Sequence, residues 1–127
     1  MDIEELARVT IDCGFHLHKN LGPGLLESVY EAIMADQLSR RGLKVQRQAG
    51  IPIRYEGIEL LEGFRADLII EGALLVELKS VERLLPLHGK QVLTYLRLLD
   101  LPLGLLINFG GETFKEGVKR IANNHQN

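Results

Sequence analysis

The stretch at residues 64–79 reads FRADLIIEGALLVELK, two short runs rich in Leu, Ile and Val that are separated by Glu71-Gly72. Short apolar runs broken by a Gly-containing dipeptide are typical of an antiparallel hairpin. Because side chains alternate between the faces of a strand, Glu77 and Lys79 share one face, and the hairpin can bring Asp67 to the same edge. Two carboxylates and an ammonium would then meet among apolar neighbours, where charges are costly unless they pair or bind a metal.

The composition is that of an ordinary globular protein. The chain has 127 residues, 46% of them hydrophobic and 25% charged, which predicts a single domain over residues 1–127. No apolar run approaches the roughly 20 residues that span a bilayer, and the acidic N-terminus lacks the basic start of a signal peptide. The single cysteine, Cys13, excludes an internal disulfide and suits a reducing compartment. We therefore expect a cytoplasmic protein that does not bind membranes.

The charge pattern bears on the partner. A net charge of −2 argues against indiscriminate binding of polyanions, because domains that bind them are usually strongly basic. A modest basic rim around an acidic pocket would still suit a metal-dependent enzyme acting on nucleic acid. Ordinary solvated surface charge explains the same residues equally well. The basic residues concerned are Arg40, Arg41, Lys44, Arg47, Arg54, Lys79, Arg83, Lys90 and Arg97.

Periodicity and turn residues predict the remaining elements. Apolar residues at helical spacing indicate three long helices and one short amphipathic helix near the C-terminus. Runs rich in β-branched and other apolar residues, bounded by turn residues, indicate strands. The predicted helices are 2–20, 25–41, 86–99 and a short one marked by Phe114, Val118 and Ile121, and the predicted strands are 43–48, 51–55, 58–61, 64–70, 73–79 and 103–109.

This order of elements predicts an α/β fold. Strands in succession favour an antiparallel meander, whereas the helical crossover from strand 73–79 to strand 103–109 favours a right-handed parallel pair. The expected architecture is a mixed β-sheet flanked by helices.

The hairpin carries the residues best suited to bind a metal. Asp67 and Glu77 supply the oxygen ligands that a hard cation such as Mg²⁺ or Mn²⁺ prefers, and the backbone carbonyl of Leu78 could add a third oxygen. Beside the metal, the Lys79 ammonium can orient or help to activate a water and balance charge on a scissile phosphate. A surface ion pair at the end of a strand is the structural alternative, because Glu-Leu-Lys is a common tripeptide.

Two helices offer further polar groups. Glu27 lies in the first turn of the second helix, with Glu31 one turn later on the same face. Compensation of the helix dipole is an equally good explanation for Glu27. The third helix carries His88, Gln91 and Tyr95 in one stripe, and Gln and Tyr can hydrogen-bond a phosphate, a water or a carboxylate ligand. A half-exposed helix face would show the same stripe.

Four motifs follow one another along the chain: Gly24-X-X-Glu27-X-X-Tyr30, Asp67, Glu77-X-Lys79 and Gln91-X-X-X-Tyr95. Together and in this order they resemble the GxxExxY protein family, part of the PD-(D/E)XK nuclease superfamily. The resemblance covers roughly residues 3 to 120, and Ala66 stands where the superfamily motif has a proline, which donates no ligand. It implies a restriction-endonuclease-like αβββαβ core, here with an extra N-terminal helix.

The resemblance also implies roles for individual residues. Asp67 and Glu77 would be metal ligands, Lys79 the catalytic lysine and Glu27 the carboxylate contributed by a helix. A further pair, Gln91 and Tyr95, falls where the exonuclease branch of the superfamily has its Gln-X-X-X-Tyr motif.

The favoured interpretation is thus a magnesium-dependent (or manganese-dependent) nuclease that hydrolyses phosphodiester bonds in DNA, or with less support RNA. The main alternative is a catalytically silent module that binds nucleic acid or protein and retains the nuclease fold. A third interpretation, compatible with both, is an interaction subunit that associates through Leu84, Leu85, Leu101 and Leu103. A domain this small is also expected to need a homodimer or a partner protein to hold a duplex.

Overall fold

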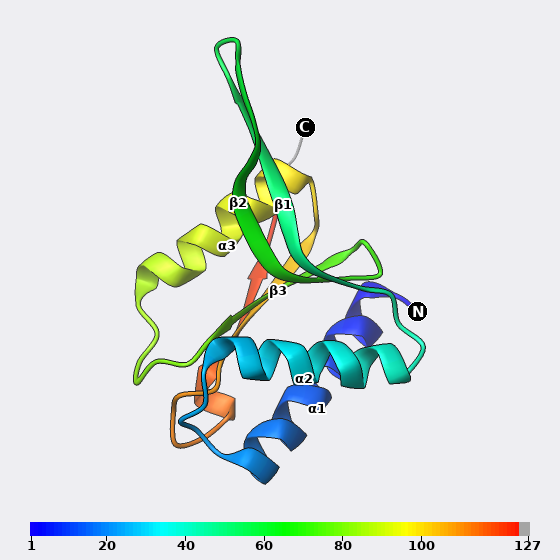
Figure 1. The fold of residues 1–127 in the computed structure, drawn as a ribbon, viewed down its shortest axis with the longest axis vertical. Coiled ribbons are helices and arrows are strands. Elements are labelled where there is room, and N and C mark those ends of the chain that lie inside the picture. Colours follow the sequence, from blue (N-terminus) through cyan, green and yellow to red (C-terminus); the bar gives the residue numbers. More distant parts are fainter. Residues whose placement is uncertain (125–127) are drawn as a thin grey trace.

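The computed structural model describes residues 1–124 of the chain. Five strands form one sheet in the order β1-β2-β3-β4-β5, in which β3 and β4 run parallel and the other neighbours antiparallel (Figure 1). The α/β class and the mixed sheet are therefore confirmed. No helix in this part of the chain is both long and apolar enough to cross a membrane. The elements are α1 (Ile3–Leu21), α2 (Glu27–Arg40), β1 (Val45–Tyr55), β2 (Ile58–Ile70), β3 (Leu74–Lys79), α3 (Pro86–Leu99), β4 (Leu103–Asn108), the 3₁₀ turn η1 (Lys115–Gly117) and β5 (Val118–Ala122).

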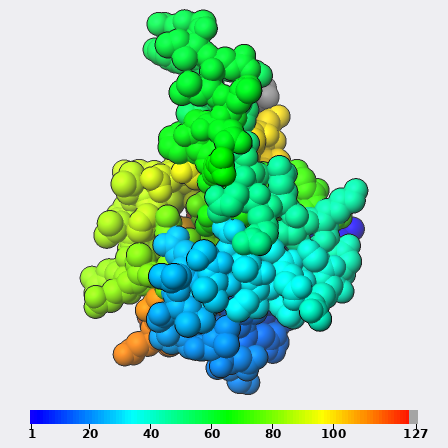
Figure 2. Space-filling model, viewed as in Figure 1, coloured from blue at the N-terminus to red at the C-terminus, as the bar shows by residue number. Residues whose placement is uncertain are grey.

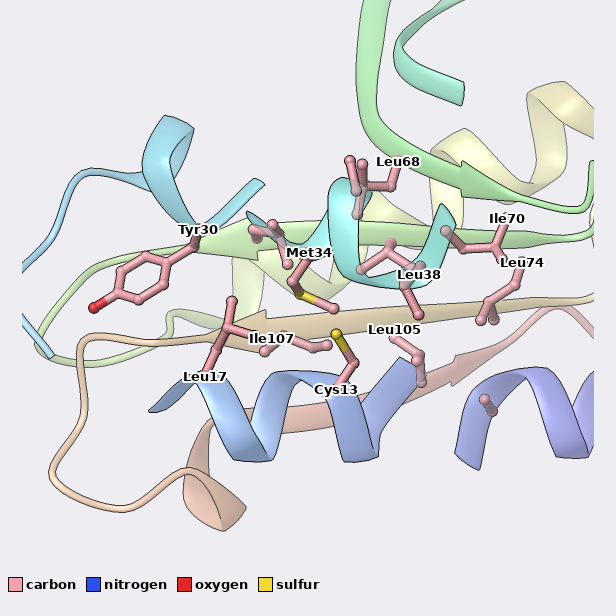
Figure 3. Close-up of a cluster of buried hydrophobic side chains, with 14 of the residues drawn as sticks. Cys13, Leu17, Tyr30, Met34, Leu38, Leu68, Ile70, Leu74, Leu105 and Ile107 are labelled. Atoms are coloured by element: carbon pink, nitrogen blue, oxygen red, sulfur yellow. The ribbon is translucent and has the colours of Figure 1, made fainter. Parts of the chain in front are cut away.

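Helices cover both faces of the sheet. One apolar layer packs α1 and α2 against the sheet, with Cys13 of α1 and Met34 of α2 meeting strand residues such as Ile107 (Figure 3). The second layer packs Val92 and Leu96 of α3 against the opposite face. Because β3 and β4 are buried on both faces, they read as nearly continuous apolar runs. A charged residue inside such a strand, as Glu77 is, therefore requires a specific explanation.

Two of the predicted strand boundaries do not exist. The predicted strands 43–48 and 51–55 form the single strand β1, and 58–61 and 64–70 form the single strand β2. Cross-strand pairing runs from Val45 opposite Ile70 to Tyr55 opposite Ile58, and so carries both strands through the positions of the predicted breaks.

The predicted C-terminal helix is wrong. Phe114 is buried beside a short 3₁₀ turn, and the chain then forms β5, paired with β4. Val118 packs against the α1/α2 layer and Ile121 against the α3 layer. Residues three apart lie on opposite faces of a strand, so spacing that looked like one face of a helix serves both sides of the sheet.

The proposed leucine association surface does not form as a unit. Leu103 is buried in β4, and Leu84 and Leu101 are partly buried against the α3 layer. Leu85 remains exposed. Three of the four side chains are used by the core, which leaves too little of this surface for association.

The distal halves of β1 and β2 form a two-stranded arm (residues 51–64) that projects from the body of the molecule (Figures 1 and 2). Its tip is the Glu56-Gly57 turn, where both residues have positive φ, as a tight hairpin turn requires. Large apolar side chains remain exposed along it, namely Tyr55, Ile58, Leu60, Leu61 and Phe64.

Where the arm meets the body, the β1–β2 ribbon changes the face that it buries. Val45 packs in the α1/α2 layer, whereas Ala49, an even number of residues later, packs in the α3 layer. On β2, Leu68 likewise packs in the α1/α2 layer and Ala66, two residues earlier, in the α3 layer. Gln48 lies at this crossing with a left-handed φ of 48°. We call this point the turnover; it places Gln48 and Asp67 between the two layers.

Candidate active site

The hairpin brings Asp67 and Glu77 together by extending the β2–β3 ladder with side chains. Backbone pairing runs from Ile70 opposite Leu74 to Leu68 opposite Val76. The next hydrogen bonds come from carboxylates: Glu77 Oε1 accepts from the Asp67 amide at 2.9 Å, and Asp67 Oδ2 accepts from the Leu78 amide at 2.8 Å. Both carboxylates are thereby fixed where β2 leaves β3.

Burial and mutual repulsion set the electrostatics of this pair. Glu77 is 7% exposed, and burial, followed by the charge of Asp67, raises its pKa to about 8. Burial also raises the pKa of Asp67, against the opposing effect of its hydrogen bond from Leu78. The Lys79 charge lowers the pKa of both carboxyls but is a minor influence on each. Within residues 1–124 neither carboxylate forms a salt bridge.

Helix α3 borders the pair on one side. Tyr95 is 8% exposed, and burial, followed by the charges of Glu77 and Asp67, raises its pKa. Gln91, one turn earlier, is half-buried and lines a small cavity together with Tyr95. His88 has a structural role instead, because its Nδ1 accepts a hydrogen bond from the Leu85 amide and caps the start of α3.

A family model of the PD-(D/E)XK nuclease superfamily matches residues 4–121. The chain belongs to this superfamily. Membership indicates a nuclease-like function, and nucleases of the PD-(D/E)XK superfamily generally use divalent metal ions and bind nucleic acid. No curated protein and no solved structure shows significant similarity to the chain. The narrower assignment to the GxxExxY family stays a prediction.

The donor set suits the divalent ion that PD-(D/E)XK nucleases use. Among the described residues, the buried Glu77 and the half-buried Asp67 have no salt-bridge partner, so a hard cation could compensate their charge. The exposed Glu27 is close enough for its charge to raise the pKa of Glu77. Among the described residues, however, no three acidic, His or Cys side chains form a ready coordination group. Metal binding by Glu27 and by the Leu78 carbonyl therefore stays a prediction.

The tyrosine of the Gly24-X-X-Glu27-X-X-Tyr30 motif is a structural residue. Tyr30 is fully buried and its ring stacks on Phe109 with centroids 4.2 Å apart. Its hydroxyl donates to the Gly22 carbonyl at 2.5 Å. The motif thus anchors the loop before α2, which positions Glu27 at the start of that helix.

A second group of polar side chains, to which the sequence assigned no role, supports Asp67. The Gln48 amide donates to Glu31 Oε1 at 2.5 Å and to Asp67 Oδ1 at 3.3 Å. Glu31 is 5% exposed, and its other oxygen accepts from Arg47 at 3.1 Å. Glu31 had one indication in the sequence that it lies near the site, namely its place on the same helix face as Glu27. Gln48 had none, because its position depends on the turnover.

Proposed function

We propose that the protein is a Mg²⁺- or Mn²⁺-dependent phosphodiesterase that hydrolyses DNA. The proposal rests chiefly on one observation: the half-buried Asp67 and the buried Glu77 form an adjacent carboxylate pair that has no salt bridge within residues 1–124, in a chain of the PD-(D/E)XK nuclease superfamily. Asp67, Glu77, the Leu78 carbonyl and Glu27 would hold the ion. When bound, the ion would neutralise charge on the phosphate and make a bound water more acidic.

The residues around the pair have distinct tasks in this proposal. Hydrogen bonds from the Asp67 and Leu78 amides hold the two carboxylates in place. Lys79, next but one to Glu77 on β3, would donate to the attacking water or to the phosphate. Gln91 and Tyr95 would orient the strand by hydrogen bonding. In the reaction the water oxygen attacks phosphorus, one P–O ester bond breaks, and the leaving oxygen takes up a proton.

One observation also favours the alternative, a catalytically silent module. The two carboxylates complete the β2–β3 ladder, and a protein that had lost activity would still need them for that purpose. Such a module would bind nucleic acid or protein through the same fold. DNA is favoured over RNA on the family resemblance alone. The proposal also includes a cytoplasmic location, and a homodimer or a partner protein that helps to hold the substrate.

A cleavage assay separates the two. Purified protein is offered single-stranded, duplex and branched DNA, and RNA, with Mg²⁺ or Mn²⁺. Lys79→Ala should lower kcat and kcat/KM together, by on the order of 10²-fold, because it removes a group that acts in the transition state. Lys119→Ala, which removes an exposed lysine of β5, is the matched control and should cleave like the wild type. Wild-type protein that binds these substrates but cuts none of them with either metal would establish the module instead.

A further inference from the structure

A small cavity lies between α3 and the base of the arm. It encloses about 180 Å³ and is lined by Phe64, Leu87, Lys90, Gln91, Thr94 and Tyr95. Phe64 is 41% exposed and Leu87 58% exposed, so two large apolar side chains face the solvent at its mouth. Exposed aromatic and apolar groups around a concave site are characteristic of ligand binding rather than of a solvated surface.

The cavity shares two residues, Gln91 and Tyr95, with the proposed active site. The Phe64 ring packs against Tyr95, with centroids 5.1 Å apart and ring planes inclined by 43°. Phe64 also lies three residues before Asp67 on β2, joined to it through the buried Ala66.

We propose that this cavity holds an unpaired nucleobase of the strand whose phosphate reaches Asp67 and Glu77; the inference rests on the proposed function and adds a substrate class to it. The exposed Phe64 ring provides a stacking surface, and Leu87 an apolar wall. The Gln91 amide can both donate to and accept from a base edge. The Lys90 ammonium can pair with a neighbouring phosphate.

The chemistry selects an unpaired base over a duplex. In a duplex both faces of each base are covered by its neighbours, so a base can stack on Phe64 only after it leaves the stack, and this unstacking costs free energy. Single strands and frayed ends avoid that cost. The preferred substrate is thus single-stranded nucleic acid or an unpaired end. An apolar protein partner fits less well, because it would leave the polar groups of the lining residues Lys90 and Gln91 without a partner.

Binding to Phe64 variants tests the inference. Affinities for a fluorescein-labelled oligothymidylate and for a blunt duplex are measured by anisotropy in EDTA, so that no strand is cut. Phe64→Ala should weaken single-strand binding by about ten-fold, the scale of one lost stacking contact, and leave duplex binding unchanged. Phe64→Trp should retain the affinity because it retains a stacking surface. Tyr55→Ala, an exposed aromatic near the tip of the arm, is the matched control and should bind like the wild type.

An abasic scan of the oligonucleotide then locates the contact. One position should exist at which removal of the base weakens binding to the wild type but not to Phe64→Ala, because the two changes delete the same interaction. A uniform abasic profile in the wild type would overturn the inference, and this test holds even if Phe64→Ala folds poorly by circular dichroism.

The remaining outcomes separate the inference from the proposed function. Wild-type cleavage together with unchanged single-strand affinity in Phe64→Ala would overturn the inference and leave the proposed function intact. A wild type that neither binds nor cuts nucleic acid would overturn both. Loss of self-association in Phe64→Ala with no change in nucleic-acid affinity would assign the cavity to protein docking and overturn the inference.

Discussion

Glu77→Gln should stabilise the metal-free protein at alkaline pH and abolish its stabilisation by Mg²⁺. The folded protein holds the Glu77 proton more tightly than the unfolded chain does, since burial and Asp67 raise the pKa from 4.5 to about 8. A raised carboxyl pKa stabilises the fold below pH 4.5, and this stability is lost progressively as the pH rises through 8. The stability of the Glu77→Gln protein has no such pH dependence, because glutamine is neutral. Its side-chain oxygen can still accept the hydrogen bond from the Asp67 amide.

The magnitude follows from the shift. At pH 8, ionisation of Glu77 should cost the metal-free fold about 4 kcal/mol relative to the protonated limit. For a chain of this size that corresponds to a melting-temperature difference on the order of 10 °C between the wild type and Glu77→Gln. At about pH 5 the two proteins should melt close together. Added Mg²⁺ at pH 8 should raise the melting temperature of the wild type alone, because binding to the folded state stabilises it by mass action.

The assay is thermal unfolding followed by circular dichroism from about pH 5 to about pH 9, with EDTA or with Mg²⁺. The difference between the two proteins isolates Glu77 from the other titrating groups. Parallel melting curves across this range would refute the claim that the pair is destabilised by its own buried charge. A Mg²⁺ response retained by Glu77→Gln would refute metal binding by Glu77.

Three further predictions concern individual contacts. Asp67→Asn should abolish most Mn²⁺ binding measured by calorimetry, because it removes a charged oxygen ligand; unchanged affinity would remove Asp67 from the metal site. Gln48→Leu should weaken Mn²⁺ binding by about ten-fold through loss of the hydrogen bond to Asp67. The control Gln46→Leu, on the same strand, should leave the Mn²⁺ affinity unchanged, and equal effects of the two would contradict a specific role for Gln48. Tyr30→Phe should cost about 1 kcal/mol in denaturant unfolding, because the Gly22 carbonyl loses its donor, while kcat stays unchanged; a fall in kcat at normal stability would instead make Tyr30 functional.

The sequence was most informative where structure depends on near neighbours. The 64–79 hairpin needs only a turn and two apolar runs, and that was enough to bring Asp67 and Glu77 together. The α3 helix was equally readable, since Pro86 starts it and its apolar spacing is regular. Pairing between distant segments could not be predicted from the sequence. The continuity of β1 and β2, and the strand that replaced the predicted C-terminal helix, are both set by partners far along the chain.

The support for Asp67 shows the same limit within the site. Glu31 and Gln48 belong to different elements, and they meet only because the ribbon changes face at a residue with left-handed backbone. Left-handed backbone is uncommon for glutamine, so local propensity would predict a regular strand conformation at Gln48. Residues that reach the site through such long-range geometry leave no local pattern in the sequence.

The arm can change its length without moving the carboxylates near the point where it joins the body. The register between β1 and β2 shifts between Ile51 and Ile53, so the pairing of the tip is set separately from the pairing of Gln48 and Asp67 with their neighbours. Beyond that shift the two strands pair with each other alone, and an insertion at the Glu56-Gly57 turn would lengthen the ribbon while leaving the carboxylates in place. The length of the ribbon and the geometry of the Asp67–Glu77 pair are therefore independent in this fold, and a longer ribbon could be engineered onto an unchanged pair of carboxylates.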